Sequence, residues 1–371
     1  MVMGATDAGL YNARIDKLRQ QIAKNEMNGC ILVPGPNIRY YTGVSSFLLE
    51  RPFLLLVPKA GQIHLVAPSL ESGPYRRTDI GIVVHSWDDG EGPSHALEDA
   101  ANQLSINGSW GVEGRVPFQF LNQLLKHARP ELIDAEPILQ AVREIKEPKE
   151  QQILQRAASI LSKSFIRFPH LIKPNMTELE LASKAKTEIY ANGAEYVGDV
   201  LVESGLMAAD PHHQPSTKKI RSKESIVIDT SCTVSGYFAD ITRTFIIGKD
   251  EGFEDLYQSV LEAQEAAIEA SAPGATVGSV DYAARERLRR AQVDKYFIHR
   301  TGHGLGLEVH EAPYVVPNGE EKLLESMVFT VEPGVYIPEK MGVRIEDDVV
   351  ITKSGCKVMT KALPKEFGWW K

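Results

Sequence analysis

Apolar positions recur along the chain with two different spacings, and each spacing predicts a different kind of element. In residues 12–28, Ile15, Leu18 and Ile22 lie three or four positions apart, which is typical of the apolar face of a helix. We expect Gly29 to end this helix, because glycine readily adopts the backbone conformation found just beyond a helix C-terminus.

Short apolar runs bounded by Gly or Pro follow this helix and predict strands. They are CILVP at 30–34, the two runs of FLLLVPKAGQIHLV at 53–66 around a turn at Pro58–Gly61, IGIVVHSW at 80–87 and SWGVEG at 109–114. An amphipathic helix is expected near 118–128. Helices and strands that alternate in this way indicate an α/β domain with a mixed sheet, ending near residue 140.

The pattern changes in REIKEPKEQQILQRAASILSKSF at 143–165. Pro148 suits the first turn of a helix, and an apolar stripe follows it. The stripe consists of Ile153, Ala157, Ile160 and Leu161. A chain of 371 residues is also too long for one comfortable core. We therefore expect two domains, covering residues 1–140 and 141–371.

The second domain contains a weak internal repeat, or internal echo, of its sequence pattern. PNMT at 174–177 and PGAT at 273–276 lie 99 residues apart, and each separates two helical patterns. The positions that fall in step are Leu181 with Val280 and Ala185 with Ala284. Thr177 and Glu180 have the spacing of a capping box. Two related helix pairs flanking a sheet would explain the echo, and chance similarity is the alternative.

Composition narrows the class of protein. The chain is 43% hydrophobic and 24% charged, with 41 basic and 49 acidic residues and a net charge of −8. It has no basic run with interleaved aromatics, so we expect no nucleic-acid partner. The longest apolar runs are strand-sized, and the N-terminus lacks the apolar stretch of a secretion signal, so we expect no membrane partner. Three scattered cysteines (Cys30, Cys232 and Cys356) indicate a reduced, cytoplasmic compartment.

Carboxylates occur in strand-like runs of the second domain. In ESIVIDTSCTVSGYFADITRTFII at 224–247, a turn at Val234–Ser235 would set Asp229 opposite Asp240, whereas a turn at Ser235–Gly236 would make them diagonal neighbours on one face. Such acids could be charges at the surface ends of strands. However, an acidic residue at the end of the apolar run SIVID does not fit a purely structural strand.

A second pair of acids has the same arrangement. In MVFTVEPGVYIPEKMGVRIEDDVVI at 327–351, a hairpin centred on Pro338–Lys340 would bring Glu332 near Glu346. Like charges at this range destabilise a hairpin unless a positive charge lies between them.

The stretch HRTGHGLGLEVHEAP at 299–313 combines three histidines with three glycines. His299, His303 and His310 are separated by Gly302, Gly304 and Gly306, and each glycine would cost a helix about 1 kcal/mol relative to alanine. We interpret the stretch as a glycine-rich loop that keeps the three histidines close together.

With these motifs, residues 212–346 resemble the pita-bread metallopeptidases, which include proline dipeptidases (prolidases), proline aminopeptidases and methionine aminopeptidases. The motifs closest to the proline-specific branch are GYFADITRTF, TGHGLGLEVHEAP, TVEPGVY and GVRIEDDVVI. PGPNIRYYTG at 34–43 is similar to the smaller domain of prolidases. The resemblance implies a creatinase-type α/β N-terminal domain followed by an α+β pita-bread catalytic domain.

The resemblance also implies a metal site. Its five ligands would be Asp229, Asp240, His303, Glu332 and Glu346. Asp240 and Glu346 would bridge two divalent ions, with Asp229 on one ion and His303 and Glu332 on the other. Because the ligands are mostly oxygen, Mn or Co is expected first, with Fe or Zn as alternatives.

Further roles follow from the same resemblance. The glycines of the histidine loop would let its backbone approach metals and substrate closely. Glu332 would carry a proton, His212 and His310 would act at the reacting carbonyl, and His299 would contact the substrate. Arg344 would bind a substrate carboxylate or support a ligand, and a structural ion pair with an acid of the site is the alternative. The neighbouring His213 remains unassigned.

The chain departs from many relatives in DTSC at 229–232, where a glycine is common. Thr230, Ser231 and Cys232 would crowd the approach to Asp229, and Cys232 could touch a metal or simply pack in the core. The terminal FGWWK is expected to dock on the body of the chain or on a partner subunit.

The function implied is hydrolysis of an N-terminal Xaa-Pro bond by a metallopeptidase. We expect Xaa-Pro dipeptides as substrates, with aminopeptidase action on longer proline-containing peptides as the alternative, and a homodimer as the assembly. A creatinase-like hydrolase and an inactive binding module also share the fold, but all five ligand positions are filled here, which argues against both.

Overall fold

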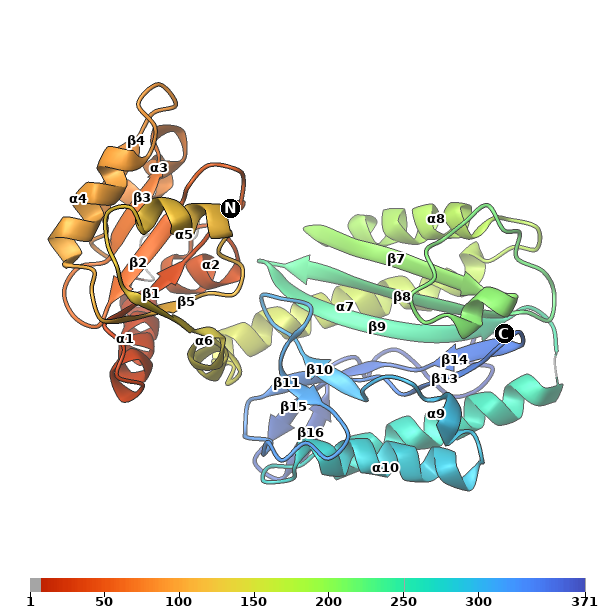
Figure 1. Cartoon of the computed structure of the whole chain (residues 1–371). Helices are drawn as coiled ribbons and strands as arrows, with labels where there is room; N and C mark the ends of the chain where they lie inside the picture. The colour runs from red at the N-terminus through yellow and green to blue at the C-terminus, as the bar shows by residue number, and fades with distance from the viewer. Residues whose placement is uncertain (1–7, 250, 371) are drawn as a thin grey trace. The chain divides into compact units, whose positions relative to one another are not determined.

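The chain folds into two compact units, residues 1–143 and residues 144–371, in a computed structural model that describes residues 8–249 and 251–370 (Figure 1). None of the helices within those described ranges has the length and apolar character needed to cross a bilayer.

The first unit is built on a six-stranded mixed sheet with strand order β4-β3-β2-β1-β5-β6. Its strands are β1 (Gly29–Leu32), β2 (Leu54–Pro58), β3 (His64–Pro68), β4 (Val83–Trp87), β5 (Ser109–Val112) and β6 (Glu131–Asp134). Its helices are α1 (Ala8–Lys24), α2 (Pro36–Thr42), α3 (Ser69–Arg76), α4 (Ser94–Leu104), α5 (Phe118–Leu124) and α6 (Glu136–Arg143). β2 pairs antiparallel with β1 and β3, and the other neighbours pair in parallel. The predicted α/β architecture with a mixed sheet is confirmed.

Two predicted boundaries in this unit are wrong. Helix α1 ends at Lys24, not at Gly29, and the chain turns through Glu26, whose φ is 57°. Gly29 is the first residue of β1, and a Cβ there would lie 2.5 Å from the ring of Trp110, so this glycine permits close packing and does not cap the helix. Helix α5 likewise stops at Leu124, short of residue 128.

The second unit places its sheets between two helix pairs. The helices are α7 (Pro148–Leu171), α8 (Glu178–Ala191), α9 (Glu251–Ala270) and α10 (Val277–Arg290), with the 3-10 turns η1 (Gly205–Ala209) and η2 (Asp294–Tyr296). The strands are β7 (Tyr196–Ser204), β8 (Ser225–Val234), β9 (Tyr237–Ile246), β10 (Gly302–Gly304), β11 (Glu311–Val315), β12 (Val328–Val331), β13 (Gly334–Ile337), β14 (Met341–Arg344), β15 (Asp347–Thr352) and β16 (Gly355–Val358). They form sheets ordered β7-β8-β9, β11-β10-β12-β15-β16 and β13-β14. In Figure 1, α7 and α8 cover the outer side of β7–β9, and α9 and α10 lie beyond β13–β16.

Helix α7 begins where the sequence predicts. Pro148 is its first residue, and Glu147 and Glu150 form a capping box at its start. Ile153, Ala157 and Leu161 are buried whereas Ile160 is only partly buried, so most of the predicted apolar stripe faces the strands. The second main core lies on the other side of the sheets, where α9 and α10 pack on β12–β15.

The internal echo corresponds to the two helix pairs. Thr177 caps α8 and Thr276 caps α10, each accepting a hydrogen bond from the backbone N–H three residues on. The in-step residues Leu181, Val280, Ala185 and Ala284 are all buried. The predicted capping box of Thr177 and Glu180 is present, with bonds of 2.7 and 3.1 Å.

The correspondence extends to the loop that returns onto each helix start. Near α8, the N–H groups of Glu178 and Leu179 donate to the carbonyls of Lys218 and Ser216. Near α10, Val277 and Gly278 donate in the same way to Glu321 and Gly319. In both halves, therefore, backbone carbonyls satisfy the N–H groups that a helix leaves unpaired at its N-terminus.

The C-terminal aromatic segment docks on its own unit. Trp369 and Trp370 pack against Phe245, with ring centroids 5.8 and 5.7 Å apart, and Phe367 packs against Tyr257 at 5.5 Å. Of the two predicted docking sites, the body of the chain is the one observed, while Lys371 lies outside the described residues.

The first unit contains a buried histidine pair that makes its stability depend on pH. His64 Nδ1 lies 2.9 Å from His85 Nε2, and burial lowers the pKa of both, that of His64 from 6.5 to about 4. Because the folded pKa lies below the unfolded value, the pair contributes fully above pH 6.5 and loses that contribution as the pH falls towards about 4.

We expect the melting temperature of wild type, measured by calorimetry, to fall more steeply between pH 6.5 and about 4 than that of a His64→Leu/His85→Leu variant. His95→Leu, at an exposed position, is the control and should follow wild type. Parallel curves for wild type and the double variant would contradict the assignment.

Candidate metal centre

The register of the β8–β9 hairpin sets the relative positions of Asp229 and Asp240. Val234 pairs with Tyr237, so the turn is Ser235–Gly236, and both turn residues have positive φ, 47° and 75°. Such a turn matches the twist of a hairpin. Asp229 is therefore opposite Thr242 and Asp240 is opposite Ser231, which makes the two acids diagonal neighbours on one face. This is the second of the two predicted registers.

The second acidic pair flanks a hairpin formed by β13 and β14. Residues 338–340 form its turn, as predicted, and Gly334 pairs with Arg344. Two positions beyond this pair, Glu332 follows β12 and Glu346 lies between β14 and β15. The hairpin thus brings both acids to its open end.

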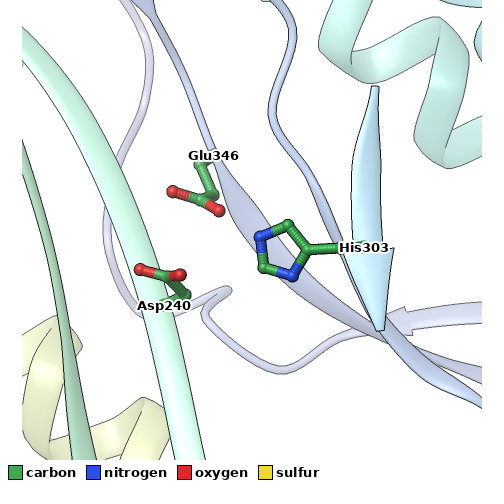
Figure 2. Close-up of side chains that lie close together, drawn as sticks. All are labelled: Asp240, His303 and Glu346. Atoms are coloured by element: carbon green, nitrogen blue, oxygen red, sulfur yellow. The ribbon is translucent and has the colours of Figure 1, made fainter. Parts of the chain in front are cut away.

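Three of the predicted ligands form a compact cluster. Ligand atoms of Asp240, His303 and Glu346 all lie within 4.8 Å of one another, and all three residues are buried. Figure 2 shows the two carboxylates and the imidazole pointing toward one another from β9, β10 and the segment after β14. Such a donor set suits a divalent cation.

The cluster opens onto a cavity of about 780 Å³. The remaining predicted site residues also line it, namely Asp229, Glu332, His212, His299, His310 and Arg344. Glu332 Oε1 lies 3.3 Å from His303 Nε2. The structure therefore brings all the predicted site residues to one cavity.

Three of the candidate ligands also have a second partner that orients them. Thr242 Oγ1 donates to Glu346 Oε2 at 2.6 Å, and Thr330 Oγ1 donates to Glu332 Oε1 at 3.3 Å. His303 Nδ1 lies 3.1 Å from the carbonyl of Gly304, which leaves Nε2 to face the cluster. Outer partners of this kind fix the orientation of metal-binding side chains.

Burial and mutual repulsion raise the pKa values of the clustered acids. Burial raises the pKa of Glu332 to about 8, with a further contribution from Asp229, while Arg344 opposes the shift. The pKa values of Asp240 and Glu346 lie well above their usual range for the same reasons. Unless cations bind, these acids must hold protons, so the charge of the site fits divalent cations.

His303 and His310 are neutral. Burial lowers the pKa of His303 to about 3 and also lowers that of His310, whose ring centroid lies 4.2 Å from that of His303. Neutral imidazole is the form that binds metal.

His299 is held by the protein on both sides of its ring. Its Nε2 lies 2.9 Å from the hydroxyl of Tyr336, and its Nδ1 lies 2.7 Å from the carbonyl of Arg300. Burial lowers its pKa to about 4. Although His299 lines the cavity, its ring nitrogens are therefore engaged within the chain.

Arg344 adopts the ion-pair arrangement that was the alternative to substrate binding. Its Nη2 lies 2.6 Å from Asp229 Oδ2, and its Nη1 donates to the Tyr336 hydroxyl at 2.8 Å. Its Nε contacts Thr242 Oγ1 at 3.2 Å. Sequence reasoning missed Tyr336 and Thr242, although Thr242 lies two residues after Asp240 and therefore on the same strand face.

The glycines near His303 have a different role from the one predicted. Gly302–Gly304 forms the short strand β10 and is not a loop. A Cβ at Gly302 would collide with the Thr330 carbonyl, and one at Gly304 with the Ala312 carbonyl. These glycines let β10 lie close to its neighbouring strands, and that placement carries His303 to the cluster.

The residues after Asp229 divide between the two faces of β8. Ser231 lines the cavity, while Cys232 is buried with its thiol 3.7 Å from the Ala157 carbonyl of α7. Burial raises the pKa of this thiol to about 12. Of the two predicted roles for Cys232, packing is the one observed.

Two family models match the chain. The model of metallopeptidase family M24 matches residues 152–353, and that of the creatinase/prolidase N-terminal domain matches residues 14–145. The Probable dipeptidase PepE of Mycobacterium tuberculosis H37Rv is 35% identical over 358 residues, covering 94% of each chain. The Xaa-Pro dipeptidase of Pyrococcus horikoshii is 34% identical over 355 residues, covering 95% of this chain and 98% of the relative.

Solved structures agree with these matches. The dipeptidase PepE from Mycobacterium ulcerans superposes with a TM-score of 0.91 at 34% identity, covering 98% of both chains. The X-Pro aminopeptidase from Thermotoga maritima gives a TM-score of 0.78 at 30% identity, covering 91% of this chain and 96% of that one.

The chain thus belongs to metallopeptidase family M24, with a creatinase-type N-terminal domain ahead of the catalytic pita-bread domain. It is a hydrolase of the metallopeptidase class, and both the resemblance and the fold inferred from sequence are confirmed. Enzymes of this family depend on a pair of metal ions, and the buried cluster is a candidate site for them here.

The raised carboxyl pKa values predict how chelation changes stability. The pKa of Glu332 is raised from 4.5 to about 8, so the folded metal-free chain holds a proton that the unfolded chain has lost. Its stabilising contribution is complete below pH 4.5 and disappears as the pH rises through about 8. Burial lowers the pKa values of His299, His303 and His310, so these three side chains stay neutral in the folded chain over this range.

We therefore expect the melting temperature of chelator-treated protein to fall between pH 6.5 and about 8. The protein in excess divalent metal should show a much smaller fall, because bound cations keep the acids ionised. Calorimetry with and without chelator measures both curves, and identical slopes would argue against metal binding at this cluster.

Proposed function

We propose that this chain hydrolyses the Xaa-Pro bond of dipeptides, as a prolidase. The observation that carries the proposal is the buried cluster of Asp240, His303 and Glu346 at the base of a cavity of about 780 Å³. Relatives named Xaa-Pro dipeptidase that align over nearly the whole chain support the choice of substrate.

Two divalent cations fit the donors around the cavity. Asp229, Asp240, His303, Glu332 and Glu346 would hold them, with Mn or Co as the first choice and Fe or Zn as alternatives. Such cations, when bound, supply positive charge that polarises the scissile carbonyl and makes a water molecule more acidic.

The proposed roles of the chain's own residues follow from their surroundings. Glu332 lies in the cavity, 3.3 Å from His303 Nε2, and would take up a proton released by the attacking water and pass it to the leaving proline nitrogen. His310 and His212 line the cavity and would orient the substrate carbonyl and stabilise negative charge on its oxygen.

Arg344 and His299 act one step further from the substrate in this proposal. Arg344 holds the Asp229 carboxylate at 2.6 Å, and Tyr336 connects Arg344 to His299 through bonds of 2.8 and 2.9 Å. This chain of contacts would fix the Asp229 ligand while His299 forms part of the cavity wall.

Proline-specific cleavage needs a dedicated cavity. Proline has no backbone N–H and its ring fixes φ, so an enzyme that grips substrates as β-strands handles it poorly. The alternative of Xaa-Pro aminopeptidase action has one supporting observation, the TM-score of 0.78 to an X-Pro aminopeptidase. The TM-score to a dipeptidase is higher, at 0.91, and favours dipeptide substrates.

The proposal also includes the cellular compartment, the oligomeric state and the domain boundaries of the enzyme. We infer a cytoplasmic homodimer whose domains cover residues 1–140 and 141–371. Three free cysteines support a reducing compartment. Sedimentation velocity would test the oligomeric state.

A product-release assay with Mn tests the activity. We expect cleavage of Ala-Pro, little cleavage of Ala-Pro-Ala and none of Met-Ala-Ala. Asp240→Asn should lower kcat/KM by more than about 100-fold together with its metal content, because it removes a ligand of the cluster. Asp88→Asn, at an exposed position in the other unit, serves as the control.

Other outcomes of the product-release assay would indicate a different activity. Preferred cleavage of Ala-Pro-Ala would make the chain an aminopeptidase, and cleavage of Met-Ala-Ala would move it outside the proline-specific branch. Full activity after complete removal of metal would refute the metallopeptidase mechanism.

A further inference from the structure

Glu178, the first residue of α8, is a completely buried carboxylate outside the metal cluster. Its Oε1 accepts hydrogen bonds from the N–H and hydroxyl of Ser204, at 3.0 and 2.6 Å. Its Oε2 lies 3.0 Å from His213 Nε2 and accepts from the N–H and hydroxyl of Ser216, at 3.1 and 2.7 Å. Although burial acts to raise its pKa, these bonds lower it, so the carboxylate is charged.

The five contacts join the two ends of one loop. Ser204 ends β7, whereas His213 and Ser216 lie beyond η1, so a single side chain ties together residues 204 and 216. Lys218 strengthens the closure, since its Nζ contacts Ser204 Oγ at 2.8 Å and Glu224 Oε2 at 2.7 Å. The enclosed segment carries His212 into the catalytic cavity.

His212 itself has little to hold it. Its side chain lines the cavity and is exposed, and its N–H contacts Asp210 Oδ1 at 3.2 Å. The adjacent His213 instead contacts Glu178. One histidine of the pair therefore serves the cavity, and the other anchors the loop.

The second helix pair shows that the fold does not require this acid. There, too, a returning loop accepts hydrogen bonds from the start of the helix, at Val277 and Gly278. Val277 occupies the position that corresponds to Glu178, 99 residues earlier. The half with the valine carries no candidate catalytic histidine on its returning loop, residues 316–322. The acid thus accompanies the histidine-bearing loop and not the helix pair as such.

We propose that Glu178 and His213 form a clamp that positions His212 for catalysis. Neither residue touches the substrate, so both are positioning residues that act through His212. The inference rests on the proposed function only in the role given to His212. Loss of the clamp should lower kcat about 10- to 100-fold, because an imidazole displaced from the reacting carbonyl stabilises it poorly, while metal content stays unchanged.

Substitutions on the same helix turn test the clamp. Glu178→Gln keeps the shape of the side chain but loses the charge and one acceptor. Glu180→Gln makes the same chemical change two residues away at an exposed capping position and should retain wild-type kcat. His213→Leu should resemble Glu178→Gln, whereas His213→Gln, which keeps a donor near the Nε2 position, should restore most of the activity.

A double-mutant cycle separates positioning from general damage. In a His212→Ala background, Glu178→Gln should cause no further loss of kcat, since its effect passes through the missing imidazole. An equal loss in both backgrounds, or wild-type kcat in Glu178→Gln, would overturn the clamp. If Glu178→Gln fails to fold, His213→Leu enters the same cycle.

Hydrogen exchange tests the clamp without any substrate. The amides of Ser204 and Ser216 donate to different oxygens of Glu178, and glutamine keeps only one of these acceptors, so at least one of the two amides should exchange at least about tenfold faster in Glu178→Gln than in wild type or Glu180→Gln. Unchanged exchange would refute the clamp. Wild type inactive on every Xaa-Pro peptide would refute the proposed function instead, and the exchange result would still decide the clamp.

Discussion

Repulsion between buried carboxylates is the constraint on which the second unit depends. Asp240, Glu332 and Glu346 lie in one cavity, and burial together with their mutual charge raises their pKa values. A purely structural sheet would avoid this arrangement, since ionised carboxylates are costly to bury without partners. The arrangement becomes favourable when divalent cations neutralise it, so the free energy of metal binding also stabilises the fold.

The surrounding chain prevents the acids from separating. Hairpins β8–β9 and β13–β14 bring them together from the backbone, and hydroxyls and one guanidinium fix their side chains. Arg344 forms an ion pair with Asp229, and Tyr336 connects Arg344 to His299. The side chains of the candidate metal centre are thus already oriented by the surrounding chain, which is a general requirement for efficient catalysis.

The two helix pairs show how the chain also holds loops in place. Both pairs hold a returning loop through the unpaired N–H groups of a helix start, but only the first adds a buried carboxylate. Helix N-termini favour negative charge, so Glu178 is stabilised where it lies while it gathers the loop around it. Of the two helix pairs, only the first therefore joins the two ends of its returning loop through a buried acid.

Local patterns in the amino-acid sequence predicted many of the elements and the family of the protein. Periodicity marked α7 and the strands of the first unit, the capping residues marked α8, and the order of acids and histidines identified the family. These features are local, because apolar spacing and turn residues act over a few positions.

The contacts between residues that lie far apart in the sequence became visible only in the folded structure. The register of β8–β9 depended on whether Ser235–Gly236 formed the turn. Glycine is needed in β10 because a Cβ there would collide with carbonyls of β11 and β12. The pairing of Arg344 with Asp229 and of His213 with Glu178 joins residues 115 and 35 positions apart. No local pattern encodes such pairs, since they form only when packing brings the strands and loops together.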